Sequence, residues 1–255
     1  LFQTAGNIIE LIEKDDIPKY LLFLENVFPY MDNYNYQKGM KEIIQESKNF
    51  LKPKDIGTDS DRALLLDFQA TLEIKPEKAI KLEKDALAQI ENITADNARL
   101  VSNLHANLGG LYRMNGHPDL AREHMEKSIS LLDQFNLLHI NDSIPQIANY
   151  AMFLTEQQEP ERGISKLQKL SGIIKEYHSD DCLDYAKVQE TLGTIYLMTA
   201  NLPQAKTHFK RAFKIYEKIW ADEPEMIEAK YQEIQELYPQ IGFCIGKNLS
   251  GLLTK

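Results

Sequence analysis

The chain has 255 residues, of which 43% are hydrophobic and 26% charged, and its formal net charge at pH 7 is −9. This composition is typical of an ordered globular chain. The acidic excess argues against nucleic acid as a partner, because phosphate binding needs clustered cations. No apolar run approaches the roughly 20 residues that cross a bilayer, so we expect no membrane partner.

The elements can be predicted in chain order from apolar residues at helical spacing, because no stretch alternates with the period of two that is typical of strands. A partial hairpin at 1–14 is followed by a divergent hairpin at 16–51. Four more helical hairpins are expected at 60–91, 96–134, 144–176 and 183–219, and a C-terminal capping hairpin at 223–255. No linker is long enough to divide the chain, so residues 1–255 are predicted to form one all-α array.

The hairpins are related by an internal repeat of 42 residues. Residues 108–112 (Leu-Gly-Gly-Leu-Tyr) recur at 192–196 (Leu-Gly-Thr-Ile-Tyr), an offset of 84, or twice 42. Thirteen places after each leading residue stands a small residue, with a proline shortly before it: Ala79, Ala121, Gly163 and Ala205. The small residues let helices approach closely, and proline suits the start of a second helix. One hairpin cannot bury its apolar face alone, so neighbouring hairpins must stack.

These positions resemble the tetratricopeptide repeat, whose pattern is Leu-Gly-x-x-Tyr followed by Ala, Phe and a second small residue. The copy that matches best has Leu192, Gly193, Tyr196, Ala205, Phe209 and Ala212 at these places, whereas Asp67 and Glu83 depart from the pattern in the copy at 66–91. The period of 42, in place of about 34, is similar to that of kinesin-light-chain-like repeats and of repeats associated with NB-ARC signalling ATPases. The resemblance implies a right-handed superhelix (α-solenoid) of stacked helical hairpins.

The resemblance also implies which residues line a concave groove, because the family's first helices turn certain places inward. Here these places give the candidate residues Asn103, Asn107, Gly110, Arg113, Asn149, Met152, Lys187, Glu190 and Thr194. An Asn side chain donates and accepts hydrogen bonds, so it can pair with the backbone of an extended peptide. The alternative is that these Asn residues only solvate the groove or bond neighbouring helices.

Signals of catalysis are few. The six histidines show no His-Glu-x-x-His or Cys/His spacing, and we interpret them as exposed structural residues. Residues 242–247 resemble a phosphate loop only loosely, because they follow no strand and lack the Ser or Thr. Lys206, Lys210, Lys214 and Lys218 recur every fourth residue, which favours a solvated face over a patch for an anionic partner. We therefore predict no enzyme, no cofactor and no metal site.

Two functions stay open. The first is a non-catalytic scaffold module that binds a protein or peptide segment in the groove, as the interaction or sensor part of a larger signalling or regulatory protein. The alternative is an architectural array that self-associates without a peptide ligand. Cys182 and Cys244 form no disulfide framework, which favours a reducing, cytoplasmic compartment. The chain begins at Leu1 instead of Met, so we expect a segment of a longer protein.

Overall fold

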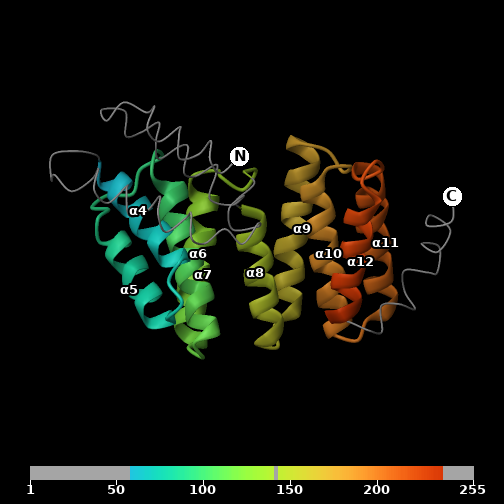
Figure 1. The fold of residues 1–255 in the computed structure, drawn as a ribbon, viewed down its shortest axis with the longest axis horizontal. Helices are drawn as coiled ribbons and strands as arrows, with labels where there is room; N and C mark the ends of the chain where they lie inside the picture. The colour runs from blue at the N-terminus through green and yellow to red at the C-terminus, as the bar shows by residue number, and fades with distance from the viewer. Residues whose placement is uncertain (1–57, 141–142, 238–255) are drawn as a thin grey trace. The chain divides into compact units, whose positions relative to one another are not determined.

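The computed structural model describes residues 58–140 and 143–237, which form nine α-helices and no strand (Figure 1). The chain divides into two compact units, of which unit 1 ends at Phe135 and unit 2 begins at Asn136. The predicted hairpins at 1–14 and 16–51, the phosphate-loop-like segment at 242–247 and the end of the capping hairpin lie outside the described residues. The prediction of one continuous array over 1–255 stays a prediction.

Unit 1 contains two described hairpins, which correspond to the predicted ranges 60–91 and 96–134. The first pairs α4 (Asp59–Thr71) with α5 (Pro76–Leu87), and the second pairs α6 (Ala98–Met114) with α7 (Pro118–Gln134). Helix α6 also packs against α4 and α5, so the two hairpins stack. Ala63, Ala86 and Leu104 are fully buried where three of these helices meet.

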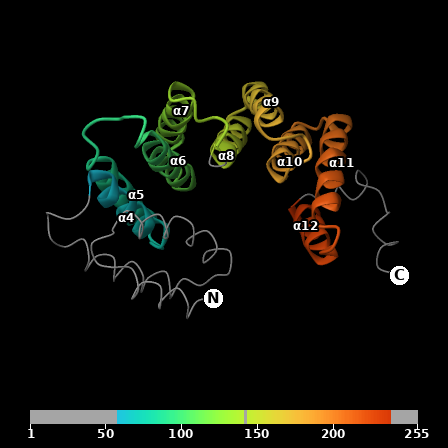
Figure 2. The ribbon, with the colours of Figure 1, turned by 90° about the horizontal axis from the view of Figure 1, so that it is seen from above.

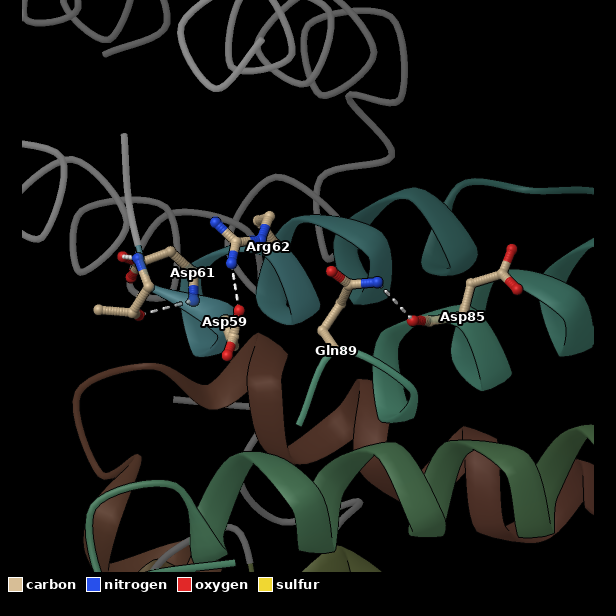
Figure 3. A network of polar contacts seen from close by, with 6 residues as sticks. Asp59, Asp61, Arg62, Asp85 and Gln89 are labelled. Carbon is tan, nitrogen blue, oxygen red and sulfur yellow. Dashed lines mark hydrogen bonds and ion pairs between the residues drawn. The ribbon is translucent and has the colours of Figure 1, made fainter. Parts of the chain in front are cut away.

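Helix α4 begins with a capping box that fixes its first turn (Figure 3). The Thr58 side chain accepts a hydrogen bond from the Asp61 amide at 3.2 Å, and the Thr58 amide donates to the Asp61 carboxylate at 2.6 Å. Arg62 forms an ion pair with Asp59 one turn away. Such a cap satisfies two backbone N–H groups that a helix start otherwise leaves unpaired, and it typically contributes about 1 kcal/mol.

Unit 2 contains two further hairpins and one more helix. Helix α8 (Ser143–Glu156) pairs with α9 (Pro160–Tyr177), and α10 (Leu183–Met198) pairs with α11 (Leu202–Ile219). Helix α10 also packs against α8 and α9, and α12 (Pro224–Leu237) contacts α11 (Figures 1 and 2). Phe153, Leu154, Leu170, Leu192 and Phe209 are at most 1% exposed and form much of the core.

The turn inside a hairpin repeats with the same period as the sequence. Gly116, Gln158 and Ala200 are 42 residues apart, and all three have a left-handed backbone, with φ of 75°, 64° and 58°. In each turn the following N–H reaches back five residues: His117 to Tyr112, Glu159 to Leu154 and Asn201 to Tyr196, at 2.9, 2.8 and 2.7 Å. This is the Schellman motif that ends a helix. It reverses the chain, and a proline at the next helix start completes the connection.

The small residues of the repeat lie where the two helices of a hairpin cross. A Cβ atom added to Gly109 would lie 2.5 Å from Met125 Cγ, and one added to Gly193 would lie 2.9 Å from the Phe209 ring. Ala121 and Ala205 are fully buried in the second helices. The prediction of an all-α fold of stacked hairpins is therefore confirmed for the described part of the chain.

Candidate functional site

Five of the nine candidate residues lie on neighbouring first helices of unit 2. Asn149 and Met152 are on α8, whereas Lys187, Glu190 and Thr194 are on α10, and these two helices pack against each other. Asn149 and Lys187 are exposed, and the other three are half-buried. We call these five residues the first-helix surface of unit 2. The Asn149 amide has no hydrogen-bond partner among the described residues, so its donors and acceptor are available.

Glu190 is the one member of this surface that joins three helices. The buried Tyr216 hydroxyl of α11 donates to Glu190 Oε2 at 2.6 Å, and Lys230 Nζ of α12 lies 2.9 Å from Glu190 Oε1. Burial, and then the Glu190 carboxylate, raise the pKa of Tyr216. Burial alone would lower the pKa of Lys230, but the charges and hydrogen bonds of Glu190 and Glu233 together outweigh it and raise that pKa. A ligand that used Glu190 would have to compete with these contacts.

The other four candidates lie on α6 of unit 1. Asn107 is exposed, and its amide nitrogen donates to Asp67 Oδ1 of α4 at 2.8 Å. The alternative role for these Asn residues, bonding a neighbouring helix, therefore describes Asn107. A Cβ atom added to Gly110 would meet nothing within 4 Å, so there is open space next to this position. Asn103 and Arg113 are half-buried.

The nine candidates thus form two sets, one in each unit. Within unit 1, the hydrogen bond of Asn107 joins the first helices α4 and α6, and within unit 2 the contact of α8 with α10 does the same. Each unit by itself has the side-by-side first helices that the repeat predicts. That one groove runs through all nine residues stays a prediction.

A pair of carboxyl groups in unit 1, the buried Glu83 and the half-buried Asp67, was not predicted as a site. Asp67 stands 42 residues before Gly109, at the equivalent place of its own copy, and Glu83 likewise stands 42 residues before Met125. Since Gly109 lies directly against Met125, the repeat places Asp67 beside Glu83. Glu83 is only 1% exposed, and its Oε2 atom has no hydrogen-bond partner.

The electrostatics of this pair follow from its burial. Burial, the charge of Asp67 and a hydrogen bond to Asp67 together raise the pKa of Glu83 to about 10. Two adjacent carboxylates do not both ionise cheaply when one of them is buried, so the neutral form of Glu83 is favoured at pH 7. The pair is a structural contact next to Asn107, which bonds Asp67, and its sequence signal was the departure from the repeat pattern.

The outer face of α11 carries the lysine series found in the sequence. Lys206, Lys210 and Lys214 are exposed, and Lys218 forms an ion pair with Asp181. The hydrogen bond and charge of Lys218 lower the pKa of Asp181. Within residues 58–140 and 143–237, no cluster of three or more His, Cys, Asp or Glu side chains could hold a metal ion. None of the helices in the same ranges is both long and apolar enough to cross a membrane.

Comparison with known proteins agrees with this geometry. The tetratricopeptide-repeat pattern matches residues 143–218, which comprise the α8–α9 and α10–α11 hairpins. No curated protein matches the sequence. The chain is similar in fold to two structures of a Podosopora anserina putative kinesin light chain with nearly identical TPR-like repeats. Their TM-scores are 0.60 and 0.58, at 11% identity over 82% of this chain and 98% of those chains.

A third solved structure has the same fold. The structure of BtubC (BKLC) from P. vanneervenii aligns with a TM-score of 0.53 and 16% identity, over 80% of this chain and 74% of that one. At these identities the likeness shows the fold, and the repeat pattern at 143–218 adds the sequence evidence. Residues 143–218 therefore carry the tetratricopeptide-repeat pattern, and the described part of the chain has the fold of such repeats.

Proposed function

We propose that this chain holds an extended segment of a protein partner against its first helices and performs no catalysis of its own. Tetratricopeptide repeats are in general protein-interaction scaffolds, which agrees with the repeat pattern and the fold of this chain. The observation that carries the proposal is the first-helix surface of unit 2, where an exposed Asn149 with an unbonded amide lies beside Met152 on α8 and next to α10.

The chemistry of this surface suits a peptide backbone with one apolar side chain. Asn149 can donate to a backbone carbonyl and accept from a backbone N–H of the same segment. Met152 is half-buried and offers a flexible apolar contact that adapts to different side chains. Lys187 has a side chain that is 54% exposed, and its nearest carboxylate, Asp184, lies 3.9 Å away, so Lys187 can also bind an acidic group of the partner.

The test is a display library of ten-residue peptides selected against the full chain. Asn149→Ala and Lys187→Ala should each weaken a selected peptide about two- to tenfold, because one hydrogen bond contributes about 0.5–1.5 kcal/mol. Lys210→Ala on the outer face of α11 is the matched control and should leave binding unchanged. If binding survives the double substitution Asn149→Ala with Lys187→Ala but is lost when Lys206, Lys210 and Lys214 are changed to Glu, the peptide binds to the outer face of α11 and the proposal is wrong.

The wider setting is part of the same proposal. We place the module in a larger cytoplasmic signalling or regulatory protein, and the free thiol of Cys182 supports a reducing compartment. If the library yields no peptide and the chain instead shows concentration-dependent sedimentation, the alternative of a self-associating array replaces the peptide scaffold.

A further inference from the structure

Two histidines meet between the helices of the α6–α7 hairpin. His105 Nδ1 of α6 lies 2.9 Å from His124 Nδ1 of α7, and the ring centroids are 5.1 Å apart. Tyr112 stacks on His124, with centroids 5.4 Å apart and an angle of 27°. Both histidines are half-buried, so the interpretation of the histidines as exposed is wrong for this pair. At this distance one neutral imidazole donates its N–H and the other accepts.

The equivalent place in unit 2 has one histidine and one glutamine. An offset of 84 relates His105 to Gln189 and His124 to His208, and the same offset relates Tyr112 to Tyr196. His208 Nδ1 lies 2.9 Å from Gln189 Oε1, and Tyr196 stacks on His208 with centroids 5.3 Å apart. The Gln189 oxygen accepts a hydrogen bond from a neutral or a protonated His208. The hydrogen bond of unit 2 therefore keeps its acceptor on protonation, although burial and then the charge of Arg211, which also donates to Gln189 Oε1 at 3.4 Å, lower the pKa of His208.

We propose that the His105–His124 contact is an acid-sensitive latch, through which the α6–α7 hairpin opens more readily at low pH than the α10–α11 hairpin, whose contact keeps its acceptor. A first proton leaves an imidazolium that donates to the remaining imidazole. A second proton removes the only acceptor and places two cations at hydrogen-bond distance. The latch does not rest on the proposed function, although α6 carries Asn103 and Asn107 and opening would displace them.

The charges around the pair favour its neutral form. Lys127 of α7 and Lys84 of α5 are the cations that face it, and Lys84 Nζ lies 5.5 Å from the Tyr112 centroid. Burial, then His124 and Lys127, lower the pKa of His105 to about 4. Burial and Lys84 also lower the pKa of His124, and the charge of Glu123 opposes them only in part. The His117 ring also lies near the pair, and its centroid is 6.2 Å from that of Tyr112.

The direction of the pH effect follows from these shifts. Because the folded pKa of His105 lies below its ordinary value of 6.5, the unfolded chain binds more protons between about pH 6.5 and 4. The stability of the hairpin is complete above pH 6.5 and is lost as the pH falls toward 4. Glu83 in the same unit changes stability with pH in the opposite direction. The effect of the latch is therefore measured as the difference in pH dependence between a variant and the parent chain.

Hydrogen–deuterium exchange of the full chain at pH 7 and pH 4.5, corrected for the intrinsic pH dependence of exchange, separates the two hairpins. In the parent chain, amides of α6 and α7 should lose protection about tenfold or more at pH 4.5, and the amides of α10 and α11 should lose clearly less. His105→Gln copies the arrangement of unit 2 and should reduce the loss to that of α10 and α11. Gln189→His is the reciprocal variant and should transfer acid sensitivity to α10 and α11.

Equal acid sensitivity of α6 and α7 in the parent chain and in His105→Gln would overturn the proposal. So would a Gln189→His variant whose α10–α11 protection is unchanged at pH 4.5. If His105→Gln does not fold, the Gln189→His comparison and an NMR titration of His105 in the parent chain still test the proposal. A His105 that titrates near its ordinary value would refute the latch.

Discussion

The carboxyl pair of unit 1 allows one substitution whose sign is unusual for a buried residue. Glu83 is 1% exposed, and the pKa of its carboxyl is raised from 4.5 to about 10. Folding at pH 7 therefore requires proton uptake by a side chain that is ionised in the unfolded chain. From pH 4.5 to 7 this uptake costs at most about 3–4 kcal/mol, at about 1.4 kcal/mol per pH unit.

Glu83→Gln keeps the shape of the protonated acid and needs no proton. Its amide can donate to Asp67 in place of the carboxyl proton. We expect the free energy of unfolding of unit 1 to rise by about 1–3 kcal/mol at pH 7, with the upper end reduced by relaxation around the pair. A raised folded pKa gives stability that is complete below pH 4.5 and is lost as the pH rises toward 10. The variant should lack that loss.

Urea unfolding followed by circular dichroism at several pH values between 6 and 9 measures both effects. Glu77→Gln is the control, because Glu77 is an exposed acid on the same helix and should change stability by less than about 0.5 kcal/mol. Hydrogen exchange of α4 and α5 assigns any change to unit 1. A Glu83→Gln variant that is less stable than the parent chain at pH 7, with an unchanged pH dependence, would show that Glu83 is ionised and refute the reasoning.

Three further predictions concern packing and turns. Ala205→Leu should destabilise the chain by about 1–3 kcal/mol, because this fully buried residue lies at a helix crossing. The exposed Lys210→Leu is the control and should change the free energy of unfolding by less than about 0.5 kcal/mol, as measured by urea denaturation of both variants. Ala200→Gly should stabilise by about 0.5–1 kcal/mol, since φ of 58° is strained for alanine, and a lower melting temperature would contradict this. Tyr216→Phe should cost about 1–2 kcal/mol and loosen α12, which the fluorescence of the single tryptophan can report.

The positions of the helices were predictable because the repeat places similar residues at equivalent positions of each hairpin. The hairpin expected at 183–219 is formed by α10 and α11, which begin at Leu183 and end at Ile219. Only one of these three turns has a glycine, because Gln158 and Ala200 adopt the same left-handed backbone as Gly116. The surrounding helices determine that conformation, and for this reason single-residue turn preferences alone would have missed two of the three turns.

The contacts of the candidate residues were less predictable, because they join different repeat positions. The sequence predicts that Glu190 belongs to an inward-facing surface, but it does not reveal that Tyr216 and Lys230 hold its carboxylate. Lys230 lies in α12, where the repeat pattern has weakened. The hydrogen bond of Asn107 likewise depends on Asp67, a residue that departs from the pattern. A family pattern therefore predicts the location of a surface better than it predicts which of its side chains are available.

Departures from the repeat carry the information that the repeat itself lacks. Places that touch in one copy also touch in the others, so two unusual residues at touching places are expected to form a pair. The contact of Gly109 with Met125 thus predicts a contact of Asp67 with Glu83. What such alignment does not supply is protonation, which depends on how far a pair is buried and on which charges surround it. Burial and the charge of Asp67 favour the neutral form of Glu83 for that reason, and the position of the pair in the repeat alone would have suggested only a weakened core.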